Sequence, residues 1–227
     1  MADPEAVSDL VSWLVGFGPG LLWLWWIHRK DAREPEPLHF VLGTYTLGVL
    51  AALAWLRARA AIDANLDWAH EPLLDAFVVT AAGEELVKLL AFLPAFLHDE
   101  NDEPLDGVVY GTAAGLGFAS LENMLFVQMT GSALLGLERA FTALLVHVAC
   151  SGSLGYWLGC ARFARGAARW RLASFGLGAA VVCHGLFDVL LAAGDRGALF
   201  ALLGLLPLLL FALSLQIRLA QSRSGRT

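Results

Sequence analysis

The sequence predicts an all-α protein, a bundle of about seven helices that cross a membrane. Of its 227 residues, 58% are hydrophobic and 16% are charged, and the mean hydropathy is +0.63. A soluble domain of this length would be about one-half apolar and about one-quarter charged. Apolar runs of about 20 residues recur along the whole chain, and a helix of that length crosses a bilayer.

The apolar runs leave no room for a separate soluble domain, so we expect residues 1–227 to form one transmembrane domain in the lipid bilayer. The first ten residues contain no Lys or Arg, whereas a secretory signal needs a positive stretch before its apolar run. We therefore expect the first apolar run to be a span. No basic cluster lies outside the loops beside the membrane, which argues against nucleic-acid binding.

The first two spans are expected over residues 7–27 and 39–56. The first ends in a tryptophan-rich stretch before basic residues, 23–30, a combination typical of the membrane interface. The polar stretch 58–72 after the second span is expected to be a loop in water.

The third and fourth spans, residues 73–97 and 107–129, combine apolar with polar residues. The third contains the sequence EELVK, residues 84–88. The fourth is rich in glycines, which allow helices to approach closely. A strongly acidic loop is expected between them.

The last three spans are expected over residues 133–160, 172–193 and 198–219, and the first of them begins at about residue 133 or residue 139. An arginine-rich loop separates the first two. The final span has no charged residue until Arg218.

The distribution of basic residues predicts the orientation of the bundle. Seven spans place ten Lys and Arg residues on one side of the membrane, against four on the other: Arg57, Arg59, Arg139 and Arg196. Cytoplasmic loops carry the excess of Lys and Arg. We therefore expect the N-terminus outside and the C-terminus in the cytoplasm.

Three charged residues, Glu84, Glu85 and Lys88, lie within the third span. A charged side chain at membrane depth costs about 2.5–3.5 kcal/mol on insertion scales, so such residues usually mark function. A simple ion pair between Lys88 and one glutamate a turn away would account for one carboxylate but not for two.

The buried polar groups of four spans are expected at one depth. Counted from the outer ends of their spans, Glu84, Glu122, His147 and His184 lie roughly 10–17 Å below the surface, at 1.5 Å per residue. Since unrelated core residues have no reason to agree in depth, these groups are expected to meet in the outer half of the membrane.

Imidazole and carboxylate groups gathered in this way predict a metal site, because both are good zinc ligands. Asp188 lies one turn from His184 and is either a further ligand or the acceptor that holds the ring. Glu84 lies one turn from Lys88, whereas Glu85 points about 100° away. One glutamate is thus expected to reach a polarised water while Lys88 or the metal holds the other, an arrangement suited to hydrolysis.

Each residue also has a structural interpretation. A lone histidine in a span, such as His147, often serves only to form a hydrogen bond between helices. Glu122 and Asn123 are as well suited to join helices as to form a site. A haem between two histidines would leave the buried glutamates unexplained. Ligation by Cys183 is disfavoured because it points about 100° away from His184.

Four motifs occur in order in consecutive spans: EExxK, FxxxEN, a histidine in the next span, and HxxxD. They comprise Glu84, Glu85 and Lys88; Phe118, Glu122 and Asn123; His147; and His184 and Asp188. With these motifs the stretch of residues 73–190 resembles the PrsW family of intramembrane metalloproteases, part of a wider group with the CAAX prenyl endopeptidases and bacteriocin-immunity-type proteases.

The resemblance implies a zinc-dependent proteolytic site in a catalytic core of about residues 73–194. It implies a multi-pass protein of the bacterial plasma membrane. It also implies a single-span membrane protein as substrate, such as an anti-sigma factor cut on its extracytoplasmic side. The polar stretch 58–72 would lie on that side, where it is placed to control access.

The resemblance also suggests a role for each residue. Glu84 would be the general base, although Glu85 is almost equally suited. His147, His184 and Glu122 would be the metal ligands, with Glu85 the next candidate. Lys88 would orient a glutamate, while Asn123 and Asp188 would support the water or the oxyanion.

Two other classes of function stay open. Relatives with this fold can be non-catalytic scaffold or assembly subunits. Such a protein would cleave no substrate, so Glu84→Gln would cause no loss of cleavage. A proton-coupled transporter could use the same residues as a relay, and its activity would survive chelators. Prenyl-protein processing is disfavoured because that group typically has FxxxH where this chain has Phe118 and Glu122.

Overall fold

The computed structural model describes residues 4–29, 35–99 and 101–224, and within these ranges it contains helices and no strand. Its elements are α1 (Pro4–His28), α2 (Leu38–Asn65), η1 (Asp67–His70), α3 (Pro72–Leu74), η2 (Asp75–Ala81), α4 (Ala82–Phe96), α5 (Pro104–Thr130), α6 (Ala133–Ala140), α7 (Ala143–Phe163), α8 (Ala167–Ala192), α9 (Asp195–Phe200), η3 (Ala201–Leu205) and α10 (Leu206–Ser224). The all-helical prediction is confirmed.

Within the described ranges, five helical segments are long and apolar enough to cross a membrane. They are Asp9–His28, Leu38–Asn65, Ala133–Phe163, Ala167–Ala192 and Asp195–Ser222. The other two expected spans carry the polar residues: residues 72–96 are divided among α3, η2 and α4, and α5 is glycine-rich. Their crossing of the membrane stays a prediction, as does the orientation of the termini.

The expected loop over residues 58–72 is largely helical, so this part of the sequence prediction was wrong. Helix α2 continues to Asn65, and η1 follows almost at once. Arg59 explains the extension, because it forms ion pairs of 2.8 Å with Asp63 one turn on and with Asp75 of η2. Because these ion pairs satisfy the polar side chains, this polar stretch continues the helix and does not form a loop.

Helix α5 is the centre of the bundle and packs against α7, α2 and α1. Every residue from 105 to 121 is buried. Glycines make this possible: a Cβ on Gly107 would collide with the carbonyl of Gly155, and one on Gly111 with the carbonyl of Ser151. The two helices therefore pack backbone against backbone, which fixes the position of α7.

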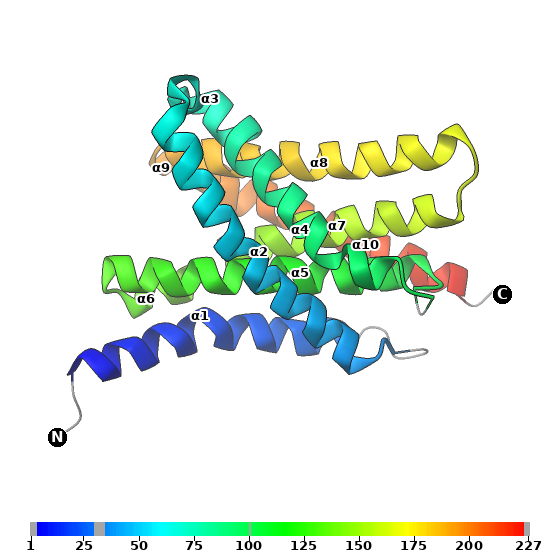
Figure 1. Ribbon diagram of the computed structural model, residues 1–227, viewed down its shortest axis with the longest axis horizontal. Coiled ribbons are helices and arrows are strands. Elements are labelled where there is room, and N and C mark those ends of the chain that lie inside the picture. The colour runs from blue at the N-terminus through cyan, green and yellow to red at the C-terminus, as the bar shows by residue number, and fades with distance from the viewer. Residues whose placement is uncertain (1–3, 30–34, 100, 225–227) are drawn as a thin grey trace.

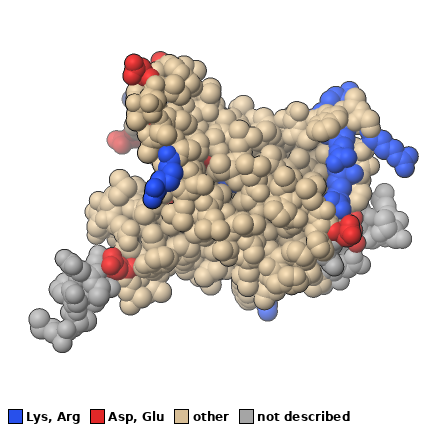
Figure 2. Space-filling view, in the orientation of Figure 1, with Lys and Arg blue, Asp and Glu red and all other residues tan. Residues whose placement is uncertain are grey.

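Helices α1, α5, α7 and α8 lie along the long axis of the molecule, and α2 and α4 cross them obliquely (Figure 1). On the face shown in Figure 2, charged side chains gather mainly towards the two ends of that axis, with a broad uncharged surface between. This distribution suits a protein surrounded by lipid. Lys30, Arg33 and Arg226, which contribute to the charge count, lie outside the described residues.

Candidate functional site

The two adjacent glutamates lie in the first turn of α4, directly after the π-helix η2. A π-helical turn is rare and is frequently found beside functional sites. It changes the rotation of the following helix, so it contributes to which way Glu84 and Glu85 point.

Lys88 joins the polar groups of α4 to those of α7. Its side chain is fully buried, and Nζ lies 3.2 Å from Oε2 of Glu84, 2.9 Å from Oε1 of Glu85 and 2.7 Å from Nδ1 of His147. The ammonium also lies 4.4 Å from the centre of the Phe118 ring. Because an unpaired charge is costly inside a protein, the lysine and the two carboxylates depend on one another.

Glu85 uses both carboxylate oxygens within the protein. Oε1 lies 3.0 Å from Nδ1 of His184 as well as beside Lys88, and Ser151 donates a hydrogen bond of 3.3 Å to Oε2. The residue is completely buried and does not line the cavity that lies beside Glu84 and the two histidines. A carboxylate on one ring nitrogen orients a histidine so that the other nitrogen is available, here Nε2 of His184.

A cavity of about 700 Å³ lies beside these residues. The polar residues that line it include Glu84, Glu122, His147, His184 and Asp188. Nε2 of His147 lies 3.1 Å from Oε2 of Glu122, and Nε2 of His184 lies 3.8 Å from Oε2 of Glu84 and 3.6 Å from Oδ2 of Asp188. The structure therefore brings together the groups that were expected at one depth.

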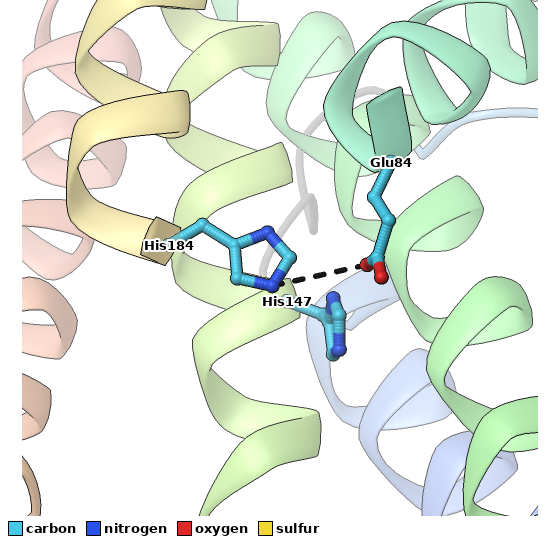
Figure 3. A group of neighbouring side chains, drawn as sticks. All are labelled: Glu84, His147 and His184. Carbon is cyan, nitrogen blue, oxygen red and sulfur yellow. Dashed lines mark ion pairs between the residues drawn. The ribbon is translucent and has the colours of Figure 1, made fainter. Parts of the chain in front are cut away.

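The donor set fits a divalent metal ion. Among the described residues, Glu84, His147 and His184 each offer a ligand atom, all within 4.8 Å of one another and all on buried side chains. Figure 3 shows the three converging from different helices. Both histidines have Nδ1 beside a partner and Nε2 beside cavity carboxylates, and imidazole with carboxylate is the chemistry of a zinc site.

Asn123 does not share this position. Its amide nitrogen donates to the carbonyls of Val15 and Gly136, at 3.1 and 3.0 Å, and it does not line the cavity. These bonds tie α5 to α1 and α6. The contacts of Asn123 are therefore those of a helix-joining residue.

Two residues of the site were not singled out from the sequence. Ser151 lies one turn after His147 on the same face of α7, so helical periodicity could have pointed to it. Arg139, treated in the sequence only as a loop charge, lines the cavity at the end of α6. His70 and Pro72 also line it, which places the stretch 58–72 at its edge.

The chain is similar to known proteins over most of its length. The family model described as PrsW family intramembrane metalloprotease matches residues 36–215. Protease PrsW of Geobacillus kaustophilus is 36% identical over 183 residues, 80% of each chain. Protease PrsW of Bacillus subtilis is 31% identical over 78% of this chain and 81% of its own. No solved structure matches the chain.

Proposed function

The chain belongs to the PrsW family of intramembrane metalloproteases, and on that premise we propose that it is a zinc-dependent endopeptidase of a bacterial plasma membrane. The five apolar helices of its described part, together with its relatives, make it an integral membrane protein of the protease class. The proposed substrate is a single-span membrane protein, of the anti-sigma-factor type, cut near the outer face of the membrane.

One observation carries the proposal: two buried histidines present Nε2 to a cavity lined by carboxylates, and the carboxylate of Glu85 lies beside Nδ1 of His184. A structural ion pair needs no cavity. A proton relay does not require two imidazole nitrogens to converge on one open space, whereas a metal that keeps an open position does.

We assign His147, His184 and Glu122 to hold the metal. Nε2 of His147 is the nitrogen left beside Glu122, because Lys88 faces Nδ1. A neutral ring that binds through Nε2 carries its proton on Nδ1, so in the loaded site Lys88 is expected to keep only its two glutamate contacts. When bound, zinc supplies a Lewis acid that polarises the peptide carbonyl and makes water more acidic.

Glu84 is the proposed general base. It lines the cavity beside His184, and Lys88 holds it from behind through Oε2. It accepts a proton from the attacking water, whose oxygen bonds to the carbonyl carbon of the substrate. When the carbon–nitrogen bond then breaks, Glu84 returns the proton to the leaving nitrogen.

Asp188 lies at the same opening, 3.6 Å from Nε2 of His184, and its carboxylate is partly exposed. We propose that it holds the water by accepting a hydrogen bond. Glu85 has a different role: it positions His184 and does not touch the substrate.

The proposal is tested by metal analysis and cleavage together. Purified wild-type chain in lipid vesicles is expected to hold about one zinc per chain and to cut a single-span reporter, with the cut inhibited by chelators and restored by zinc. His147→Ala and His184→Ala are expected to lose both metal and cleavage. Full metal retention in both variants would remove the metal site from the proposal.

Glu84→Gln separates an enzyme from a scaffold. An enzyme is expected to keep its metal and lose cleavage in this variant. A scaffold subunit would show no cleavage even as wild type, and a transporter would show uptake that depends on a proton gradient and persists with chelators.

A further inference from the structure

A second cavity, of about 570 Å³, adjoins the proposed catalytic cavity. It is lined by Phe126, Leu135, Glu138, Arg139, Phe141, Thr142, Leu191 and Leu202. Arg139 and Leu191 line both cavities, so the two spaces are neighbours and not separate sites.

The second cavity is mainly apolar. Five of its eight lining residues are apolar, and two of these, Phe126 and Phe141, are aromatic. The side chains of Phe141 and Leu135 are exposed, so the cavity opens at the surface of the protein. An apolar groove that joins a catalytic cavity to the protein surface suits an apolar side chain of a membrane substrate.

Arg139 lies at the junction of the two cavities. Its guanidinium carbon is 4.6 Å from the centre of the Phe126 ring. Its Nε is buried and has no hydrogen-bond partner among the described residues. A guanidinium has five N–H donors and stacks on aromatic rings, so the Phe126 contact leaves the donors at its edge available for acceptors.

We propose that Arg139 is a substrate-binding residue, and this rests on the proposed peptidase function. Its guanidinium donates hydrogen bonds to main-chain carbonyl oxygens of an extended substrate segment. That segment runs from the catalytic cavity past Arg139 and places one large apolar side chain in the second cavity. The enzyme therefore prefers Leu, Phe or Met at one position next to the bond that is cut.

A cross-linking experiment tests occupation of the second cavity without cleavage. The photoreactive residue benzoylphenylalanine replaces Leu202, or as control Leu203, which is adjacent, 75% exposed and outside the lining. Both changes are made in the full chain carrying Glu84→Gln, in vesicles. The probe is a synthetic single-span peptide of Leu and Ala flanked by Lys, with an extended outer segment.

The expected cross-link from position 202 is several-fold stronger than from position 203, and Arg139→Gln is expected to weaken it. Equal yields from the two positions would overturn the proposal, whether or not wild-type protein cuts the peptide. Absence of cleavage by the wild-type chain would instead count against the proposed function.

Cleavage of a mixed peptide library, read by mass spectrometry, tests the preference. Leu202→Trp is expected to reduce cleavage before or after large apolar residues by roughly tenfold at one position and to shift it towards small residues. Leu203→Trp is the control and is expected to keep the wild-type profile. Leu135→Trp narrows the same cavity from α6 and is expected to act as Leu202→Trp does, so a folding defect in one variant leaves the other decisive.

Kinetics test Arg139 itself. Arg139→Gln is expected to raise KM about tenfold or more, because it removes charged hydrogen bonds, with little change in kcat. Arg139→Lys is expected to recover part of the loss, since it keeps the charge but not the fork of donors. An unchanged KM in Arg139→Gln, or a fall in kcat alone, would overturn the role.

Discussion

The carboxylate of Glu85 lies 3.0 Å from Nδ1 of His184, on the side of the ring that is turned away from the cavity. Its neighbour in the chain, Glu84, lines the cavity and faces Nε2 of the same ring. The two glutamates therefore act on opposite nitrogens of one histidine. This arrangement suits Glu85 to positioning and Glu84 to chemistry.

Glu85→Gln is expected to weaken zinc affinity and kcat/KM by about 10- to 100-fold, because the amide still accepts a hydrogen bond from Nδ1 but lacks the negative charge. Zinc titration and peptide cleavage measure the two effects. Ser151→Ala is the matched control: it removes one hydrogen bond of 3.3 Å from the same carboxylate and should change either quantity only slightly. Wild-type values for Glu85→Gln would contradict the positioning role.

Lys88→Met is expected to destabilise the protein by about 3–5 kcal/mol, because it leaves two buried carboxylates without their cation. The free energy of unfolding in mixed detergent micelles measures the loss. The double variant Lys88→Met with Glu85→Gln removes a charge of each sign and is expected to regain part of the stability but none of the activity. Equal stability in the single and double variants would show that the charges are not coupled.

The sequence predicted the polar cluster better than the division of roles within it. Counting residues from the outer ends of the spans placed Glu122, His147 and His184 near one depth, because each residue of a helix adds a fixed rise. It could not choose between Glu84 and Glu85, since adjacent residues differ by about 100° and the rotation of α4 is set by its tertiary contacts. The π-helix η2 just before them changes the rotation of α4 further, and no apolar periodicity in the sequence indicates that change.

The helix ends were also hard to predict. The extension of α2 depends on a contact between Arg59 and Asp75, 16 positions apart in sequence, so local composition indicated a loop. Arg139 was hidden for a similar reason: in the sequence it is one charge near a span end, and only packing of α6 brings it to the cavity.

Gly111→Ala is expected to destabilise the bundle by about 1–3 kcal/mol, because the new methyl group collides with the carbonyl of Ser151 and forces α5 and α7 apart. The same shift moves His147, so activity is expected to fall as well. Thermal unfolding and cleavage are the measurements. Gly178→Ala is the control, since a Cβ there meets nothing within 4 Å and Ala favours a helix more than Gly does, so no loss is expected. Equal losses in both variants would contradict the packing explanation.

Cysteine labelling tests the predicted orientation. In a background without Cys150, Cys160 and Cys183, His70→Cys is expected to react with a membrane-impermeant maleimide on intact cells, because the predicted topology places it outside. Arg165→Cys is expected to react only after permeabilisation. Both positions are exposed, so access alone decides the result. The reverse pattern would place the proposed site in the inner half of the membrane.

Glu84→Gln and Glu122→Gln are expected to separate the general base from the metal ligand. Oε2 of Glu84 lies 3.2 Å from the Lys88 ammonium, which weakens that oxygen as a donor to a cation. Among the described residues, Oε2 of Glu122 lies 3.1 Å from Nε2 of His147 and is not held by a lysine in the site. We keep Glu122 as the proposed third ligand because of its contact with His147, although Glu84 is the carboxylate that lies within 4.8 Å of both histidine donors.

Glu122→Gln is therefore expected to lose both zinc and cleavage. Glu84→Gln is expected to keep zinc while kcat falls by about 10²- to 10⁴-fold, the usual contribution of a general base. Metal content and single-turnover cleavage are measured on the same samples. If Glu84→Gln loses the metal and Glu122→Gln retains it, the two residues exchange roles: Glu84 joins the histidines as ligand and Glu122 accepts the proton.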